Sequence, residues 1–430
     1  MIYKNNNTSN NLVCLMNILS FFDFFCYNKA YLKSLFLKGG KKMTWNQQLM
    51  KVNNKQAILE TILERAPISR ADISQHLGLT KGTVSSLVNE LLEANLCFES
   101  GPGESSGGRR PVLLLFQEKA GYSIGIDLGV NYILGVLTDL NGDIVSEISR
   151  NTNNANYQET LERMTEMIQS LIKSAPESHY GVVGIGIGIP GIVDNKGEIL
   201  LAPNLGWKNV DLKKDMEEEF GLPVIVENEA NAGAYGEKKF GAGKDHDHLV
   251  YVSAGMGIGV GIILKNELYR GANGFSGEMG HMIIDVHGKT CKCGSKGCWE
   301  LYASEKALIE RASTLIHSEG ITLESLIEQA SHNEEISGLF KEIGHYLGIG
   351  ISNISNTFNP QQIIIGNRLA LAKEWLREPI VKIVENHALK FNQEELHISF
   401  SDLSSYSPSL GVSAHVIENF LKTNLNQQNQ

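Results

Sequence analysis

Four side chains, about two thirds of the way along the chain, have the types and spacing of a metal site. They are one imidazole and three thiols, namely His281, Cys291, Cys293 and Cys298. Three thiolates and one imidazole can complete a closed tetrahedral Cys₃His zinc site, which leaves no position for a catalytic water. We therefore expect a structural Zn²⁺. The alternative, reduced cysteines that only pack, is disfavoured because these cysteines lie among Gly, Lys and Ser instead of apolar residues.

The elements that would position this site have the pattern of an α/β body. Alternating apolar and polar residues predict strands within 122–150, joined by a turn at Asn141-Gly142. The apolar run 182–189 predicts a buried strand, and two further strands flank a glycine-rich turn at 255–261.

One glycine motif is misleading. Residues 186–191 read GIGIPG and satisfy the dinucleotide fingerprint GxGxxG. That motif needs a helix directly after it, with its N-terminus facing the pyrophosphate. Here the chain continues as IVDNKGEIL, which is typical of a hairpin with a glycine turn. We therefore expect no nucleotide binding at this motif.

The region around the cysteines resembles a known family. Residues 277–304 (GEMGH…CKCGSKGCWE…AS) are similar to the zinc-containing signature of the ROK family of repressors and sugar kinases. The resemblance includes four further stretches, at 190–191, 202–207, 227–232 and 255–261. It implies an α/β fold in which a two-lobed actin-like/sugar-kinase (ROK) body spans 120–430. One lobe would cover approximately 120–232 together with the C-terminal helix, and the other 233–404.

The resemblance also implies a set of sugar ligands. Carboxylates and amides supply the paired acceptors and donors that neutral sugars require. His281 would have two roles, with one ring nitrogen on zinc and the other donating to a sugar hydroxyl. Plain surface charge is the alternative for Glu278 and Glu300, and their place beside the zinc ligands disfavours it. The implied sugar ligands are Asn204, Asn228, Glu229, Glu278, His281 and Glu300.

The kinases of this family are similar to one another in two glycine turns, and this chain departs from both. Such turns let ATP phosphates approach the backbone. The first, D-x-G-G-T in the kinases, is DLGVN here, with the β-branched Val130 in place of a glycine. The second, G-T-G-I-G-G-G in the kinases, has Met256 for the threonine and Val260 for a glycine. We therefore expect no enzymatic activity and no catalytic residue.

A third departure concerns the carboxylate that acts as base in the kinases. They have Asn-Asp where this chain has Asn228-Glu229. The extra methylene moves the carboxylate by about 1.5 Å, a displacement that can lower a rate by roughly 10²-fold. Glu229 would also occupy the space of the sixth carbon of a hexose. We therefore expect a pentose ligand, and the resemblance to repressors of this family implies xylose as the first candidate.

Residues 44–119 predict a winged helix-turn-helix DNA-binding domain. Ser69 and Thr80 are expected to cap two helices separated by a turn at Gly78, and two apolar runs then flank a Gly/Ser wing tip. A protein-docking module is the alternative, disfavoured because the exposed helix face is neither apolar nor aromatic. The expected DNA contacts are Lys81, Thr83, Ser85, Ser86, Asn89, Arg109 and Arg110.

Charge divides the chain into three parts. Of the net charge of −10, residues 1–43 carry +5, residues 44–119 carry none, and the remainder carries −15. A neutral DNA-binding domain on an acidic body would bind DNA poorly as a single copy. We therefore expect a homodimer or higher homo-oligomer. No uninterrupted apolar run of about 18 residues occurs, so we expect a cytoplasmic protein without a membrane partner.

Residues 1–43 are expected to be a non-native or disordered extension. Their apolar stretch, 12–37, is broken by polar residues and lacks the features of a signal peptide. Lys38-Gly39-Gly40 can be encoded by a purine-rich ribosome-binding sequence just before Met43, so we expect translation to start at Met43.

In the family that the chain resembles, a winged helix-turn-helix ahead of the sugar-binding body marks the repressors. The resemblance therefore implies a transcriptional repressor of sugar (xylose) utilisation genes. Its partners would be operator DNA and a sugar inducer, and sugar binding between the lobes would release the operator. Three alternatives remain. The first is a ROK glucokinase with an added DNA-binding domain, which would phosphorylate a hexose with ATP. The second is a repressor for a phosphorylated or amino sugar, disfavoured because no implied ligand is Lys or Arg. The third is an interaction module without DNA contact.

Overall fold

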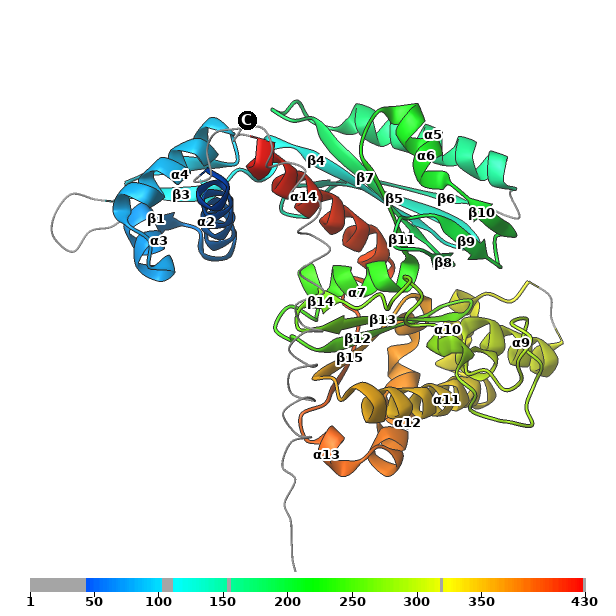
Figure 1. Ribbon diagram of the computed structural model, residues 1–430. Coiled ribbons are helices and arrows are strands. Elements are labelled where there is room, and N and C mark those ends of the chain that lie inside the picture. Colours follow the sequence, from blue (N-terminus) through cyan, green and yellow to red (C-terminus); the bar gives the residue numbers. More distant parts are fainter. Residues whose placement is uncertain (1–43, 103–110, 153–155, 318–319, 428–430) are drawn as a thin grey trace, which may run out of the picture.

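The computed structural model describes residues 44–102, 111–152, 156–317 and 320–427. The predicted extension 1–43 and the wing tip with Arg109 and Arg110 lie outside the described residues. No helix within the described ranges is long and apolar enough to cross a lipid bilayer. Figure 1 shows a small N-terminal head beside a body built on two sheets.

The head is a winged helix-turn-helix, as the sequence predicts. Ser69 forms a capping box with Asp72 at the start of α3, Thr80 caps α4, and Gly78 ends α3 with a φ of 66°. The three strands form an antiparallel sheet in the order β1-β3-β2. The elements of the head are α2 (Thr44–Arg65), β1 (Ile68–Ser69), α3 (Arg70–Leu77), α4 (Lys81–Glu93), β2 (Cys97–Pro102) and β3 (Val112–Phe116).

The first lobe is built on a five-stranded sheet in the order β11-β7-β4-β5-β6. Three strands form an antiparallel meander, with the predicted Asn141-Gly142 turn between β5 and β6, and two parallel strands follow. Helices α5 (Tyr157–Ser174) and α6 (Leu212–Phe220) cover its outer face (Figure 1). The strands are β4 (Tyr122–Leu128), β5 (Tyr132–Asp139), β6 (Ile144–Asn151), β7 (Val182–Ile189) and β11 (Val224–Asn228).

The GxGxxG motif ends in a hairpin, which confirms that no helix follows it. The motif lies at the end of β7, and β8 (Ile192–Val193) then pairs antiparallel with β9 (Ile199–Ala202). The short strand β10 (Trp207–Val210) completes this small sheet.

The second lobe repeats the same connections. Its sheet has the order β14-β13-β12-β15-β16, in which β12, β13 and β14 form the meander, and β15 and β16 add in parallel. The strands are β12 (Leu249–Ala254), β13 (Ile258–Leu264), β14 (Glu267–Leu268), β15 (Gln362–Gly366) and β16 (His397–Phe400).

The helices of the second lobe pack on its sheet in one apolar core. This core joins buried strand residues such as Val250 and Ile363 to buried helix residues such as Phe340 and Ile380. The helices are α8 (Glu300–Ala303), α9 (Glu305–Ile316), α10 (Leu323–Ala330), α11 (Glu334–Phe358), α12 (Lys373–His387) and α13 (Lys390–Gln393).

Two helices lie between the sheets and pack against each other. Figure 1 shows α14 (Ser407–Gln427) under the first sheet and α7 (Glu229–Lys239) over the second. Glycines allow the two backbones to approach. A Cβ on Gly411 would lie 1.8 Å from the carbonyl oxygen of Ala232, and one on Gly236 would lie 2.1 Å from that of Ser407. The lobes therefore meet at a tight helix crossing that tolerates no added side chain.

The far end of α14 carries the head. Leu421 and Leu425 of α14 share one buried apolar cluster with Ile58 of α2. Tyr180 of the first lobe reinforces this junction, because its hydroxyl donates to the carbonyl oxygen of Ala94 at 2.6 Å. The head is thus packed on the first lobe by apolar contacts that continue its own core.

Candidate functional site

The four predicted metal ligands come together at the start of the helical part of the second lobe. Their ligand atoms all lie within 4.8 Å of one another. The Sγ atoms of Cys293 and Cys298 are 3.6 Å apart, and Cys291 Sγ is 3.7 Å from His281 Nδ1. Tetrahedral bonds of about 2.3 Å to sulfur and 2.0–2.1 Å to nitrogen separate neighbouring ligand atoms by about 3.6–3.8 Å. The cluster can therefore hold a metal ion.

Local backbone geometry and burial both fit a metal loop. Gly294 and Gly297 have φ angles of 92° and 69°, which let the loop turn back on itself. A Cβ on Gly297 would lie 1.6 Å from the carbonyl oxygen of Asp285. Burial raises the pKa of Cys298 to about 12, so its thiolate form calls for a bound cation.

Glu300 connects this cluster to the second glycine turn. Its Oε1 lies 3.3 Å from Cys291 Sγ and 3.6 Å from His281 Nδ1. Its Oε2 faces the turn, because a Cβ on Gly257 would lie 3.1 Å from it. Trp299, next to Glu300, is fully buried and donates from Nε1 to the carbonyl oxygen of Tyr346 at 2.7 Å, which fixes the segment. The carboxylate of Glu300 is therefore held between the metal cluster and the turn.

Glu278 and His281 lie on the same side because their segment lies close against β13. A Cβ on Gly277 would lie 1.9 Å from the carbonyl oxygen of Val260, and one on Gly280 would lie 2.1 Å from that of Ile258. Desolvation raises the pKa of Glu278, and the nearby charge of Glu300 adds to the rise. The imidazole of His281 opposes it, and the net pKa is raised. The structure thus brings Glu278, His281 and Glu300 together.

Asn228 and Glu229 begin α7 at the other side of the site. Asn228 is the N-cap, with its Oδ1 accepting from the backbone N–H groups of Ala230 and Asn231. Its Nδ2 donates to the carbonyl oxygen of Gly191 at 2.8 Å. Most of the amide is therefore engaged in fixing the helix start, which leaves one N–H for a ligand.

Glu229 is bonded to the second sheet. Its Oε1 accepts from Ser253 Oγ at 2.9 Å and from Asn367 Nδ2 at 2.6 Å. Burial raises the pKa of Glu229, and these two donors lower it. On the first lobe, burial raises the pKa of Asp127 well above its ordinary value, with Glu229 adding to the rise and the hydroxyl of Tyr132 lowering it.

Asn204 is the predicted sugar ligand that the structure sets apart. It lies on the exposed turn between β9 and β10. Asn204 is connected to the other predicted sugar ligands only indirectly. Strand β9, which precedes its turn, packs against Gly191 through Leu201 and Ala202, and the carbonyl oxygen of Gly191 accepts from Asn228.

Both glycine turns are covered by side chains that sequence reasoning missed. A Cβ on Gly129 would lie 2.2 Å from the ring of Tyr132, and one on Gly255 would lie 2.9 Å from Nδ2 of Asn367. Tyr132 also donates to Asp127 Oδ2 at 2.7 Å. The sequence does show a polar residue close after the first turn (Tyr132) and directly after a strand (Asn367). It does not show that these side chains point back over the glycines, because that depends on tertiary packing.

The exposed face of α4 carries the predicted DNA contacts that the structure describes. Lys81, Ser86 and Asn89 are exposed, and Thr83 and Ser85 are half-buried. Arg70 of α3 donates to Asn89 Oδ1 at 3.3 Å and pairs with Glu99 of β2 at 2.8 Å. Asn89 is thus tied to α3 and the wing. Arg70 was missed because it lies outside the helix expected to face DNA.

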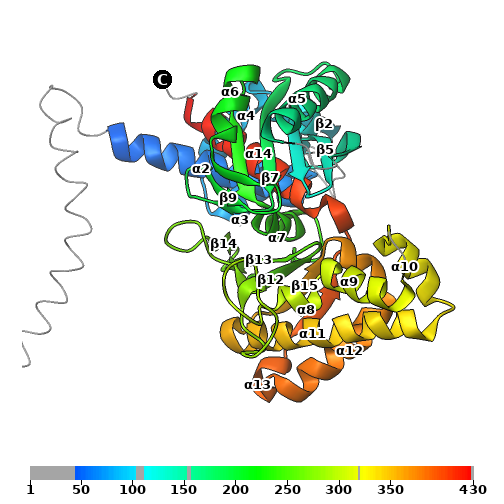
Figure 2. The same cartoon turned by 90° about the vertical axis from the view of Figure 1, so that its right-hand side faces the viewer.

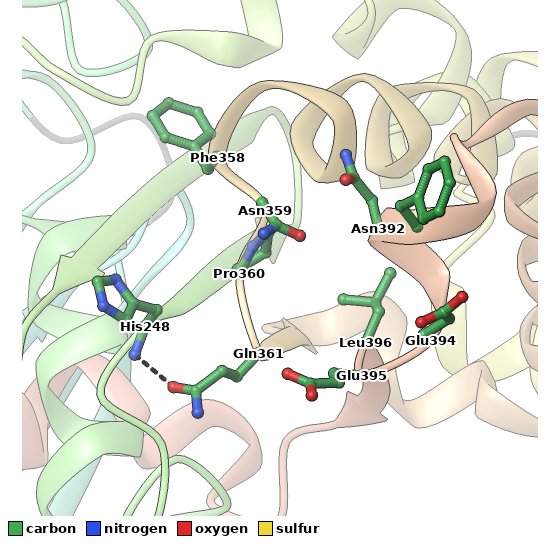
Figure 3. Close-up of a pocket in the computed structure, with 10 residues that line it drawn as sticks. His248, Phe358, Asn359, Pro360, Gln361, Asn392, Glu394, Glu395 and Leu396 are labelled. Carbon is green, nitrogen blue, oxygen red and sulfur yellow. Dashed lines mark hydrogen bonds between the residues drawn. The ribbon is translucent and has the colours of Figure 1, made fainter.

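A separate cavity of about 530 Å³ lies at one end of the second sheet and is drawn in Figure 3. It is lined by residues such as His248, Gln361 and Leu396, at the amino ends of β12, β15 and β16. Ser253 and Asn367, by contrast, stand at the carboxyl ends of the same parallel strands, where ligands bind in α/β sheets. The carboxyl ends are therefore the candidate ligand site, in preference to this cavity.

Comparisons with known proteins agree with both parts of the chain. The ROK family model matches residues 123–419, and a winged helix-turn-helix DNA-binding model matches residues 53–96. The chain is 47% identical over 378 residues to a xylose repressor of Bacillus spizizenii, covering 87% of this chain and 98% of that protein.

Two crystal structures are similar in fold. One is a ROK family transcriptional regulator, a homologue of the E. coli MLC protein, with a TM-score of 0.75 and 28% identity over 89% of this chain and 98% of that one. The other is a ROK family glucokinase from Streptomyces griseus in complex with glucose and AMPPNP. Its TM-score is 0.62 and its identity 31%, over 68% of this chain and 98% of that one.

Proposed function

The chain belongs to the ROK family, and from this premise we propose that it is a sugar-responsive transcriptional repressor. The observation that carries the proposal is that one chain joins a DNA-binding head to a sugar-binding type of body. A winged helix-turn-helix head is packed by a continuous apolar core on a sugar-kinase-like body. The head binds operator DNA through α4 and the wing, and sugar binding to the body releases it.

Xylose is the inducer that the residues favour. Glu229 carries one methylene more than the aspartate of the kinases and so fills room that a hexose would need for its sixth carbon. The relative from Bacillus spizizenii is a xylose repressor, which supports the same ligand. In this proposal Glu229, Glu278, His281 and Glu300 contact the sugar hydroxyls, Asn228 offers its remaining N–H, and Asn204, on its exposed turn, is the sixth sugar ligand.

Zinc is the metal that the donor set favours, since three thiolates and an imidazole form a closed tetrahedral site. His281, Cys291, Cys293 and Cys298 would hold it. The ion would neutralise the buried thiolates and fix the loop, so that Glu300 and the free ring nitrogen of His281 face the sugar.

Sugar would act on the head through the two central helices. Glu229 lies in the first turn of α7, α7 crosses α14 at Gly236 and Gly411, and α14 ends in the apolar core of the head. A change of lobe angle would therefore move the head. We expect the protein to act as a homodimer or higher homo-oligomer, because paired heads supply the phosphate contacts that one neutral head lacks.

Sugar kinase activity is the second candidate, because the similar structure from Streptomyces griseus is a glucokinase. Tyr132 over the first glycine turn and Asn367 over the second disfavour it. A coupled assay for ADP release with ATP and either glucose or xylose separates the two functions. Turnover well above the background of ATP hydrolysis would establish a kinase.

The test of the repressor uses the full chain. Duplexes selected from a random library by binding to the protein provide the operator probe. A gel-shift titration with xylose, glucose and a panel of other neutral sugars should show release by xylose at the lowest concentration. If no duplex is selected, or if no sugar changes the binding of the selected duplex, the proposed function is wrong.

A further inference from the structure

Asn367 has a backbone conformation that favours glycine. It follows β15 directly, and its φ of 63° and ψ of −163° lie where a side chain is strained. A residue is held in such a conformation only where the surrounding structure fixes it, and such residues gather at ligand sites and switches. The interactions of this side chain therefore carry information about its role.

The amide of Asn367 is fully occupied by neighbours. Its Nδ2 donates to Glu229 Oε1 at 2.6 Å and lies 3.0 Å from Ser253 Oγ, and its Oδ1 accepts from the backbone N–H of Arg368 at 2.7 Å. Ser253 donates to the same oxygen of Glu229 at 2.9 Å. Two donors from the second sheet thus converge on one carboxylate oxygen.

The second oxygen of Glu229 is different. Among the residues that the structure describes, no hydrogen-bond donor reaches Oε2. A carboxylate fixed through one oxygen presents the other in a defined direction, and neutral sugars are recognised by such aimed acceptors. Oε2 is therefore the atom of Glu229 that can accept from a sugar hydroxyl.

The surroundings of this carboxylate would otherwise favour its neutral form. Burial raises the pKa of Glu229, whereas the bonds from Ser253 and Asn367 lower it. The other titratable groups that face it are Asp127, Tyr132 and Tyr251, and none of them supplies a positive charge. The donors from the second sheet thus offset part of the effect of burial on the pKa of Glu229.

We propose that Asn367 is a positioning residue for the sugar ligand, which it serves by fixing Glu229 with Oε2 directed into the site. The inference rests on the proposed function, because it assumes that a sugar binds at Glu229. It also explains why a strained asparagine stands against Gly255, where a glycine would satisfy the backbone.

The test compares wild-type protein with Asn367→Gly in calorimetric titrations with xylose at pH 6, 7 and 8. Glycine adopts the backbone conformation without strain, which offsets part of the loss of the Asn367 hydrogen bonds, so the variant should remain folded at the temperature of the titration. The Kd for xylose should rise by about tenfold or more, the loss expected when a bond to a charged group is removed. The increase should be larger at pH 6 than at pH 8, because Glu229 becomes easier to protonate without its donor.

Asn359→Gly is the matched control. Asn359 also has a positive φ, of 44°, but it ends α11 beside the remote cavity (Figure 3). This substitution should leave the Kd for xylose and its pH profile unchanged. Ser253→Ala removes the second donor to Oε1 of Glu229 and should also raise the Kd for xylose. It provides the test if the Asn367→Gly variant is poorly folded.

The outcomes separate the two levels of the proposal. Wild-type protein that binds neither xylose nor any other sugar of the gel-shift panel contradicts the proposed function, and the positioning role with it. Wild-type protein that binds xylose, together with an Asn367→Gly variant of unchanged Kd at all three pH values, overturns the positioning role alone.

Discussion

The two lobes of the body share one set of strand connections but carry different attachments. In each, a three-stranded meander is followed by two parallel strands, and one central helix covers the inner face. The second lobe holds the metal cluster and, through Ser253 and Asn367, the carboxylate of Glu229. The first lobe carries the head on the far end of α14.

This difference suggests a division of labour within a repeated architecture. In the proposed function the metal cluster and most of the sugar contacts lie on the second lobe or against it, whereas the first sheet is attached to the DNA-binding head. The two are connected where α7 crosses α14, and Figure 2 shows this crossing between the lobes from the side. If the division is correct, substitutions in one lobe should affect sugar and DNA binding unequally.

Loss of the metal should have the largest effect and should be confined to the second lobe. Cys298→Ser removes a ligand, which should lower metal affinity by more than the roughly 10–100-fold that loss of an outer partner causes. We expect the sugar-induced rise in melting temperature to disappear while operator binding persists. Metal content by mass spectrometry and thermal shifts with xylose measure both. Cys97→Ser, in the head, is the control that should keep the metal, and an unchanged sugar response in Cys298→Ser would contradict the division.

The helix crossing should be the next most sensitive position. Gly411→Ala places a Cβ 1.8 Å from the carbonyl oxygen of Ala232, so we expect a loss of about 3 kcal/mol in the free energy of unfolding. Gly338→Ala is the matched control, since Gly338 lies in α11 with no atom near its absent Cβ. That substitution should stabilise the protein by about 0.5–1 kcal/mol. Chemical denaturation measures both, and equal effects would show that the crossing is not tight.

A substitution at the head junction should change operator binding and leave xylose binding unchanged, which is the reverse of the effect expected at the metal site. Leu421→Ala removes a buried side chain between α14 and the head, which should lower the free energy of unfolding by about 2–3 kcal/mol. Operator affinity should fall, or lose its response to sugar, while the Kd for xylose stays unchanged. Leu371→Ala, at an exposed position, should alter neither. If Leu421→Ala weakened xylose binding as strongly as operator binding, the separation of the two lobes would be wrong.

Acid should destabilise the interface between the central helices. His415 of α14 is stacked on Tyr235 of α7 at 3.8 Å. Burial and, to a smaller extent, the charge of Arg270 lower its pKa to about 3, while the charge of Glu418 opposes them. Because the unfolded chain binds this proton below about pH 6.5 and the folded chain does not, stability falls as the pH drops below 6.5. The loss between pH 7 and pH 5 should be about 2 kcal/mol.

His415→Phe keeps the aromatic stack without the titration. Denaturant unfolding at pH 7 and pH 5 should therefore show a smaller acid-induced loss in the variant than in the wild type. Equal losses would show that His415 is not the group responsible.

The smallest effect is expected at the ion pair that joins the lobes. Arg270, which follows β14, contacts Glu227 of β11 through two nitrogens at 2.6 and 2.8 Å. Arg270 is 37% exposed, and the buried Glu227 keeps hydrogen bonds from Asn228 and Asn231 to its other oxygen, so we expect Arg270→Ala to lower the free energy of unfolding by about 1 kcal/mol. Arg150→Ala, which breaks an exposed pair within the first lobe, should have a smaller effect still. Thermal unfolding compares the two, and a reversed order would show that the inter-lobe pair is not significant.

Local patterns predicted much of this fold. The caps at Ser69 and Thr80 and the hairpin after the GxGxxG motif depend on neighbouring residues only, and the structure has each as expected. The metal ligands could be found for the same reason, since three of the four lie within eight positions.

What the sequence could not provide depends on contacts between distant segments. Nothing in the stretch GNRLA shows that Asn367 has a positive φ or that it reaches Glu229, 138 positions away. The ring of Tyr132 over Gly129 and the use of Asn228 as a cap likewise follow from packing. The predicted roles of Arg109 and Arg110, the lobe boundaries and the sugar ligands remain predictions.

The most direct measurement of the central claim is a linked titration of sugar and DNA. Fluorescence anisotropy gives the Kd for a selected operator with and without saturating xylose, and calorimetry gives the Kd for xylose with and without saturating operator. We predict that each ligand weakens the other by the same factor, about 5–150-fold, because coupling between two sites is reciprocal. An operator Kd that is unchanged by xylose, in protein that calorimetry shows to bind it, would contradict the account.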